Sequence, residues 1–434
     1  MKIAFYGLGK LGLPYAALLA DKGHKVIGID VNNFVRQTVH DGHVPDAIRE
    51  PGLPELVKRV VHGAAKGRLT IPLGEPDGAA KGAEASIILV PTPSLPDGSF
   101  SIEYVLSAVR TIGRLIKGQD TLHTVLLVST VSPGSTGGPI RRALEMASQR
   151  YVGIYGVQLF YNPEFVQLGN VLEGMKKPFA HLLGEQDLCS IDVVKELLVG
   201  EAEIVPMTWE EAELAKLCLN CALSLKPVLA NTLAPICNYY GADVDVVTEF
   251  IGMDPRVGSK LLRAGLHPGG PCLPRDIRAL ENAGNKVLFD VPLARTIDRL
   301  GREEITLWVE FLGRLFARHF GSGSLRDVGI LGLNFKPGVL VREEAFGDRL
   351  ANALENLYPG CHTRSFDSTE QSGDMDRLDR IIEYSVILVL TLMDPKLKEV
   401  LESGVDLKNK VVVDPWRYLD RNKLHCLAYY GGLE

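Results

Sequence analysis

The stretch "KIAFYGLGKLGLPYAALLADKGHKVIGID" near the N-terminus constrains the fold more than any other part of this 434-residue chain. An apolar run predicts a β-strand, and the glycines Gly7, Gly9 and Gly12 then follow with the spacing G-x-G-x-x-G. A helical pattern comes next, and a second predicted strand ends at Asp30, 18 residues after the third glycine. This order of strand, glycine turn, helix and strand is typical of a dinucleotide-binding Rossmann unit.

Each of these residues has a physical role in such a unit. Gly7 permits the tight turn, Gly9 lets the backbone approach a pyrophosphate, and Gly12 lets the helix pack closely on the strand. Asp30 would accept hydrogen bonds from ribose hydroxyls and repel a 2′-phosphate, so the sequence predicts NAD and not NADP. The alternative is a structural turn followed by a surface aspartate, which the combined pattern makes the weaker interpretation.

Three further apolar runs, "ASIILVPTP", "HTVLLVSTV" and "VQLFYNPEF", predict strands that end in small or polar residues. Ligands bind at the carboxyl ends of strands in open parallel sheets. We therefore expect Thr92, Ser129, Thr130, Asn162 and Glu164 to converge on one crevice, although each alone would also serve as a loop cap.

The middle of the chain changes to a helical pattern of about thirty residues in "MTWEEAELAKLCLNCALSLKPVLANTLAPICNYYG". Thr208 and Glu211 have the spacing of a capping box at its start. The length predicts a central helix that joins two domains, and Pro227 and Pro235 would kink it or split it.

The C-terminal part returns to alternating strands and helices. "DVGILGLNF", "SVILVLTLM" and "KVVVDPWR" predict parallel strands, with a helical pattern over residues 343–357 between the first two. The sequence therefore predicts an α/β fold with two Rossmann-like parallel-sheet domains joined by a long central helix and a helical region.

Charge and cysteine content limit the function classes. A net charge of −6 and a pI near 6.0 argue against nucleic-acid binding, and the longest apolar runs are too short to cross a bilayer. Seven cysteines with no repeated spacing predict no disulfide framework and favour a reducing, cytoplasmic location. Cys218 and Cys221 form a C-x-x-C inside the helical pattern, so we expect two small buried residues and no metal site.

One cysteine lies in an unusual loop, "AGLHPGGPCLPRD". Cys272 follows two glycines, lies between two prolines and precedes Asp276 by four residues. Nothing in this stretch is typical of a helix or strand interior, and a cysteine there is either a reactive nucleophile or a small buried residue.

With these motifs in place, the chain resembles the nucleotide-sugar 6-dehydrogenases, the family of UDP-glucose and GDP-mannose dehydrogenases. The resemblance covers essentially the whole chain and rests on the order of "GLGKLGLP", "REPGLPEL", "VPTP", "STVSPGST", "YNPEF", "EEAELAKLCLNCA", "MDPRVG", "GGPCLPRD" and "GLNFKPG". It implies a cytoplasmic homodimer that uses two NAD to oxidise the C6 alcohol of a nucleotide sugar to a carboxylate. The implied domains are 1–205 for NAD, 206–318 for the helical dimerisation region with the cysteine loop, and 319–434 for the nucleotide sugar.

The resemblance also implies roles for single residues. Cys272 would add to the aldehyde as a thiolate, giving a thiohemiacetal and then a thioester that water hydrolyses. Lys216 and Asn220 would stabilise oxyanions at C6, and Asp276 would activate water together with Thr130 and Glu164. Arg256 would reach the site of the partner subunit. The implied cofactor set is Gly7, Gly9, Leu11, Gly12, Asp30, Thr92, Thr130 and Arg342. The implied substrate set is Glu164, Phe165, Lys216, Asn220, Arg256, Gly269 and Lys336, with no metal.

The chain departs from the family pattern at three places. Leu168 replaces a second acid after "NPEF", and "GVLVREEAF" after Lys336 lacks the usual acidic pair but keeps Arg342. His267 and Pro268 alter the loop before the cysteine, where the histidine would be a phosphate or base contact or an exposed loop residue.

The motif "CLPRD" is similar to the UDP-glucose and GDP-mannose branch of the family, and of the two we favour UDP-glucose. GDP-mannose or another nucleotide hexose is the alternative substrate. More remote alternatives are a two-electron hydroxyacid-type dehydrogenase and a non-catalytic NAD-binding relative.

Overall fold

The computed structural model describes the whole chain except residues 49, 75, 154–155, 187–190, 322, 371–373, 404, 425–426 and 429–434. The chain divides into two compact units, Met1–Leu217 and Cys218–Glu434, which we call the N-terminal and the C-terminal unit. Each unit contains its own sheet with a hydrophobic core on both faces.

The N-terminal unit is built on an eight-stranded sheet of order β3-β2-β1-β4-β5-β6-β7-β8. The six strands from β3 to β6 in this order are parallel, as predicted. The pair of β6 and β7 is antiparallel, which was not predicted. The strands are β1 (Lys2–Tyr6), β2 (Lys25–Ile29), β3 (Leu69–Thr70), β4 (Ala85–Ile88), β5 (His123–Leu127), β6 (Val157–Tyr161), β7 (His181–Gly184) and β8 (Ile204–Met207).

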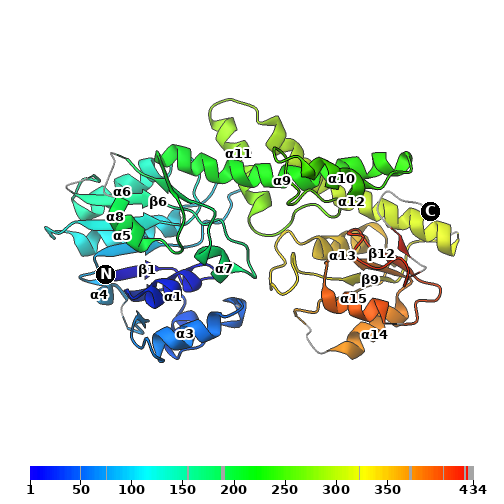
Figure 1. The fold of residues 1–434 in the computed structure, drawn as a ribbon, viewed down its shortest axis with the longest axis horizontal. Helices are drawn as coiled ribbons and strands as arrows, with labels where there is room; N and C mark the ends of the chain where they lie inside the picture. The colour runs from blue at the N-terminus through cyan, green and yellow to red at the C-terminus, as the bar shows by residue number, and fades with distance from the viewer. Residues whose placement is uncertain are drawn as a thin grey trace. The chain divides into compact units, whose positions relative to one another are not determined.

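Helices cover both faces of this sheet, with α1 and α3 on one side and α5 and α6 on the other (Figure 1). Successive residues of β1 enter opposite cores, Ile3 and Phe5 on one face and Ala4 and Tyr6 on the other. This explains why the strand sequences are continuously apolar. The helices are α1 (Gly12–Lys22), α2 (Asn33–His40), α3 (Leu53–Val61), α4 (Pro76–Ala80), α5 (Glu103–Ile116), α6 (Arg141–Ser148), α7 (Val171–Lys176) and α8 (Ile191–Leu197), with short turns η1 (Asp46–Ile48) and η2 (Thr136–Ile140).

The predicted central helix is α9 (Trp209–Tyr239), which begins in the N-terminal unit and continues into the C-terminal unit (Figure 1). Its capping box is confirmed. The Thr208 N–H donates to the Glu211 carboxylate at 2.7 Å, and the Glu211 N–H donates to the Thr208 hydroxyl at 3.3 Å. The helix runs through both internal prolines, so the alternative that they split it was wrong.

The C-terminal unit contains a five-stranded parallel sheet of order β10-β9-β11-β12-β13. The three predicted strands are β9, β11 and β12. We did not predict β10, because its sequence "TRSF" has a single apolar residue and it lies at the sheet edge. The strands are β9 (Val328–Leu331), β10 (Thr363–Phe366), β11 (Ile387–Leu390), β12 (Val411–Val413) and β13 (Leu427–Ala428).

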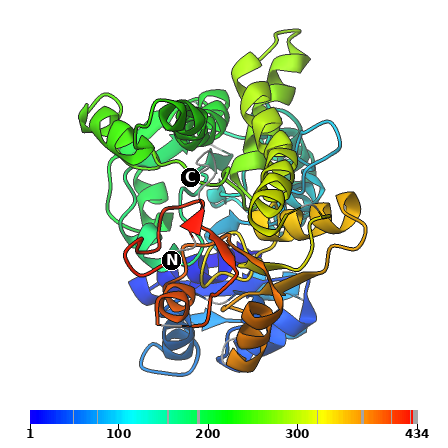
Figure 2. The ribbon, with the colours of Figure 1, turned by 90° about the vertical axis from the view of Figure 1, so that its right-hand side faces the viewer.

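Four helices of this unit cover the two faces of its sheet. Residues of α12 and α13 form one core with the strands, and residues of α14 and α15 form the other (Figure 2). The helices are α10 (Val244–Met253), α11 (Leu273–Lys286), α12 (Pro292–Phe320), α13 (Phe346–Leu357), α14 (Met375–Tyr384) and α15 (Pro395–Glu402).

Candidate functional site

The glycine turn after β1 has little room for side chains except at one position. Gly7 has a φ of 99°, and a Cβ atom there would lie 2.2 Å from the Leu89 carbonyl oxygen. A Cβ atom on Gly12, the first residue of α1, would lie 2.0 Å from the Gly7 carbonyl oxygen. A Cβ atom on Gly9 would have nothing within 4 Å. The backbone at Gly9 is therefore open to a ligand, and Gly7 and Gly12 hold the turn in place.

Asp30 follows β2 and is bonded to the glycine turn. Its carboxylate accepts the Leu8 N–H at 2.7 Å and the Asn32 N–H at 2.8 Å. The adjacent strands β1 and β4 mark the point where the strand order reverses, which is where dinucleotides bind in such sheets. The open backbone at Gly9, the start of α1 and the acid after β2 are together suited to the pyrophosphate and ribose of NAD.

The loops after β4 and β5 are tied together at the same end of the sheet. The Thr92 hydroxyl donates to the Thr130 carbonyl oxygen at 2.8 Å. The Ser129 hydroxyl both donates to the Val90 carbonyl and accepts the Val90 N–H, each at 2.8 Å. The Asn162 amide, by contrast, donates to a β7 carbonyl at 2.7 Å, so it joins the segment after β6 to β7.

Lys216 of α9 lies beside the segment that follows β6. Its ammonium donates to the Glu164 carbonyl oxygen at 2.6 Å and lies 4.5 Å from the centre of the Phe165 ring. Burial raises the pKa of the Glu164 carboxyl to about 7, although the charge of Lys216 acts in the opposite direction. A carboxyl group with this pKa can exchange a proton near neutral pH.

A buried acid that we did not predict holds the loop after Thr130. Glu213 of α9 is fully buried, and its carboxylate accepts the N–H groups of Gly134 and Thr136 at 2.6 and 2.8 Å and the Thr136 hydroxyl at 2.6 Å. Its position three residues before Lys216, on the same helical face, was the signal available in the sequence.

In the C-terminal unit, Cys272 is exposed and occupies the N-cap position of α11. The alternative of a small buried cysteine was therefore wrong. Backbone N–H groups at a helix N-terminus stabilise an anionic thiolate. Asp276 lies in the first turn of α11, is 2% exposed, and accepts a 2.6 Å hydrogen bond from the Asn220 amide, with Arg275 at 3.4 Å.

The loop before Cys272 is fixed at several points within its unit. Gly265 donates its N–H to Asn231 at 2.8 Å, and the His267 N–H donates to Glu304 at 2.9 and 3.0 Å. A Cβ atom on Gly269 would lie 2.4 Å from the Glu344 carbonyl oxygen, so this glycine is needed for close packing on the segment after Lys336.

Two predicted arginines are bonded to nearby acids. Arg256 follows α10, has a side chain that is 88% exposed, and contacts Asp254 at 2.6 Å. Arg342 is exposed and pairs with Glu370 and, at 3.3 Å, with Asp348. Neither arginine contacts a predicted catalytic residue through these bonds. Lys336 is partly buried in the loop that follows β9.

The C-terminal unit repeats the turn geometry of the first sheet, which the sequence did not reveal. Gly332 follows β9 with a φ of 114°, and a Cβ atom on Gly347 would lie 1.9 Å from its carbonyl oxygen. Asp367 after β10 accepts the Leu333 N–H at 2.7 Å. The intervening loop is longer than in the first unit, so no G-x-G-x-x-G spacing marks this turn.

The two cysteines of the C-x-x-C motif were both expected to be buried. Cys221 is buried, but Cys218 is exposed. Among the residues that the structure describes, no group of three or more His, Cys, Asp or Glu side chains is placed to bind a metal ion.

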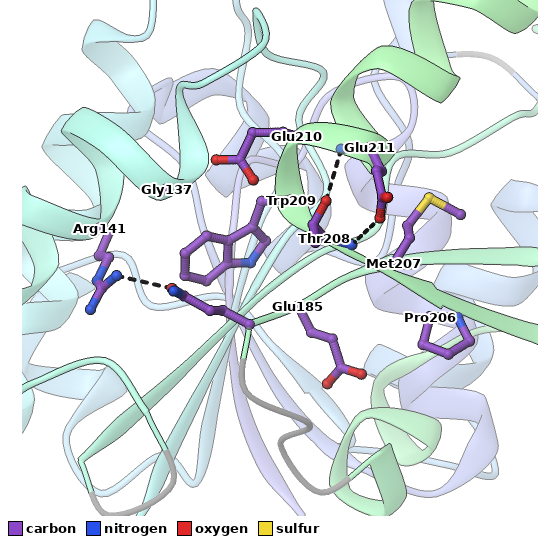
Figure 3. A pocket seen from close by; sticks show the side chains of 10 residues that line it. Gly137, Arg141, Glu185, Pro206, Met207, Thr208, Trp209, Glu210 and Glu211 are labelled. Carbon is purple, nitrogen blue, oxygen red and sulfur yellow. Dashed lines mark hydrogen bonds between the residues drawn. The ribbon is translucent and has the colours of Figure 1, made fainter.

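A cavity of about 510 Å³ in the N-terminal unit lies between the start of α6, the end of β8 and the first turn of α9 (Figure 3). Arg141 on its wall lies 6.0 Å from the Trp209 ring centre and donates to Gln186 at 2.9 Å. None of the predicted site residues lines this cavity.

Comparison with known proteins identifies the relatives of this chain. Residues 1–199 match the NAD binding domain of the UDP-glucose/GDP-mannose dehydrogenase family, and residues 210–302 match its central domain. UDP-glucose 6-dehydrogenase AglM of Haloferax volcanii is 32% identical over 344 residues, which are 78% of this chain and 77% of that protein. GDP-mannose 6-dehydrogenase of Pseudomonas syringae pv. tomato is 30% identical over 411 residues, 93% of this chain and 89% of that protein.

A solved structure has the same fold. The UDP-glucose dehydrogenase of the archaeon Pyrobaculum islandicum is 29% identical and has a TM-score of 0.85, covering 99% of this chain and 96% of that one. The chain belongs to the UDP-glucose/GDP-mannose dehydrogenase family. It is accordingly an NAD-dependent oxidoreductase that acts on nucleotide sugars.

Family membership also explains α9. By length and composition it is the one helix in the described part of the chain that could cross a membrane, with a mean hydropathy of 1.3 over an 18-residue window. It lies almost entirely within the family's central domain and carries the buried charges of Glu213 and Lys216. We therefore interpret it as a core helix of the enzyme.

Two departures from the family pattern have a structural account. Leu168, which replaces the family's second acid after "NPEF", packs against the hydrophobic core of the N-terminal unit. His267 is not an exposed loop residue, because it is partly buried against Gly301 of α12.

Proposed function

We propose that this family member oxidises the C6 alcohol of a nucleotide hexose to the carboxylate in two steps, with Cys272 as the nucleophile. The observation that carries the proposal is the exposed Cys272 thiol at the N-terminus of α11, one turn before the buried Asp276 that Asn220 holds. A thiol in this position suits covalent capture of an aldehyde.

NAD, when bound, supplies the acceptor for one hydride in each of the two oxidations. The glycine turn that would bind NAD contains Gly7, Gly9, Leu11 and Gly12. The other proposed NAD contacts are Asp30, Thr92, Thr130 and Arg342. The remaining chemistry belongs to the chain. The Cys272 sulfur bonds to the aldehyde carbon and gives a thiohemiacetal that still bears a hydrogen. Loss of that hydride leaves a thioester, and water cleaves its C–S bond to release the carboxylate and the thiol.

We assign the other residues to charge and proton control. Lys216 and Asn220 would stabilise the oxygen anion at C6. Glu164, whose pKa burial raises to about 7, would take up and release the proton of the alcohol or of the attacking water, together with Asp276 and Thr130. Phe165, Gly269 and Lys336 would line the sugar nucleotide.

UDP-glucose is the substrate that we favour, and GDP-mannose is the alternative. Relatives named for each activity are at least 30% identical to this chain, so identity to them does not decide between the two. The "CLPRD" motif fits both branches, and the likeness to the Pyrobaculum UDP-glucose dehydrogenase supports the favoured choice.

We further propose a homodimer in which Arg256 completes the partner's site. Exposed apolar side chains gather on the end of α9 and on α10 of the C-terminal unit, which supports an interface there. They are Ile236, Tyr239, Tyr240, Val246, Phe250 and Met253. The domain limits 1–205, 206–318 and 319–434 stay a prediction. A nucleophilic thiol must also stay reduced, which requires a reducing compartment such as the cytoplasm.

The test is to count NADH per sugar consumed across a panel of UDP- and GDP-hexoses, with wild-type enzyme and Cys272→Ser. We expect two NADH per sugar with the true substrate, and near-complete loss of uronate in Cys272→Ser. One NADH per sugar, or unchanged uronate formation by the variant, would refute the cysteine mechanism. No turnover with any sugar would refute the proposed activity.

A further inference from the structure

His267 is the altered loop residue that the proposed function leaves without a role. Its ring lies against α12 at Gly301, where an added Cβ atom would come within 2.4 Å of both Cδ2 and Nε2 of the imidazole. The ring therefore fills a notch that exists because residue 301 has no side chain. His267 precedes Cys272 by five residues.

The same turn of α12 also holds the backbone of this residue. The His267 N–H donates to both carboxyl oxygens of Glu304, at 2.9 and 3.0 Å, and Glu304 is 9% exposed. Arg349 of α13 donates to the Gly301 carbonyl oxygen at 3.0 Å and so helps to fix the backbone of Gly301. Ring and backbone of His267 are thus attached to one helical turn.

The imidazole of His267 does not carry a positive charge against α12. Burial, assisted by the positive charge of Arg349 and opposed by Glu344, lowers the pKa of His267 to about 4. The ring is therefore neutral at physiological pH. The ring is packed directly on α12 at Gly301, and we therefore assign its contribution to shape.

The chain between His267 and Cys272 has little slack. A Cβ atom on Gly269 would lie 2.4 Å from the Glu344 carbonyl oxygen, and one on Gly270 would lie 2.6 Å from the Phe335 ring. The double glycine is thus packed against its neighbours, and Cys272 follows directly at the start of α11. A shift at His267 would be passed on to the thiol.

We propose that His267, docked in the Gly301 notch, is a positioning residue that sets the place of the Cys272 thiol. This inference rests on the proposed role of Cys272 as the nucleophile. Since a misplacement of about 1 Å can lower a rate on the order of a hundredfold, the contact is large enough to matter for turnover.

The experiment is a size-exchange cycle in the full-length enzyme: Gly301→Ala, His267→Ala and the double variant. We expect each single change to lower kcat on the order of ten- to a hundredfold, with an unchanged KM for NAD. Gly301→Ala should lower kcat less in the His267→Ala background than in wild type, because the added methyl group then meets no ring. Strictly additive effects would overturn the proposal.

A second readout follows the thiol directly. The alkylation rate of Cys272 by iodoacetamide is measured in a background with serine at residues 189, 218 and 426, because Cys218 is also exposed and the other two cysteines lie outside the described residues. The rate should change in both single variants but not in His319→Ala, an exposed histidine at the end of α12. Alkylation and kcat equal to wild type in both single variants would overturn the proposal.

His267→Phe keeps a flat ring of similar size and guards against variants that fail to fold. We expect it to retain the alkylation rate and kcat. A folded His267→Phe enzyme without activity would overturn the shape argument and assign the imidazole nitrogens a direct role. Cys272→Ser separates a failure of the proposed function from a failure of this inference. If Cys272→Ser still forms uronate, the proposed function is refuted. If Cys272→Ser is inactive while His267→Ala has wild-type activity, only the positioning role of His267 is refuted.

Discussion

Alanine at Gly9 and at Gly12 should separate cofactor binding from folding. At Gly12 the new Cβ atom would lie 2.0 Å from the Gly7 carbonyl oxygen, whereas such contacts essentially never fall below 3.0 Å. The turn and α1 must therefore move apart by roughly 1 Å, because the Cβ atom meets a backbone carbonyl and not a flexible side chain. Overpacking of this kind costs about 1–3 kcal/mol of folding free energy, and we expect the upper end.

Alanine at Gly9 meets nothing within 4 Å, and Gly9 does not have a left-handed φ. The free energy of unfolding should therefore change by no more than about 0.5 kcal/mol. The added methyl group instead occupies the space through which a pyrophosphate would approach the turn. Loss of one charge-assisted hydrogen bond, about 1.5–3 kcal/mol, would weaken NAD binding about ten- to a hundredfold.

Urea denaturation measures the first effect, and fluorescence titration with NAD measures the second. Each variant is the control of the other. Gly9→Ala with wild-type NAD affinity would refute the assignment of this turn to the cofactor. Gly9→Ala destabilised as much as Gly12→Ala would refute the steric analysis.

Three further predictions concern carboxyl groups. Glu164→Gln should be stabilised relative to wild type at pH 8 but not at pH 4, because the raised folded pKa of about 7 makes the wild-type carboxyl costly to ionise as pH rises. Glu213→Ala should lose about 3 kcal/mol or more in urea denaturation, because three donors lose their acceptor. Asn220→Asp should place a second carboxylate against Asp276, so its loss of stability should grow between pH 5 and pH 8.

Each of these has an outcome that contradicts it. A Glu164→Gln stability difference that does not vary with pH would mean that the carboxyl is well solvated. The exposed Glu210→Ala is the control for Glu213→Ala, and equal stability losses would remove the special role of the buried acid. An Asn220→Asp enzyme as stable at pH 8 as at pH 5 would show that the two side chains separate in solution.

Local sequence signals were sufficient for most elements of the fold. Strands with continuous apolar residues were predicted because they are buried on both faces of a sheet, as Ile3 and Ala4 illustrate. The capping box at Thr208 was predicted because its bonds span three residues. The edge strand β10 and the antiparallel β7 were not predicted, because their own short sequences, "TRSF" and "HLLG", have a weak apolar pattern.

The sequence by itself determined the glycine turn, the long central helix and the identity of the candidate nucleophile, because these depend on residue types at short spacing. Only the tertiary structure decided that Cys272 is exposed at a helix start, that Glu213 clamps the loop after Thr130, and that His267 rests in a notch at Gly301. Burial and hydrogen bonding of this kind depend on residues 30 to 80 positions apart, and no local pattern encodes which of them meet.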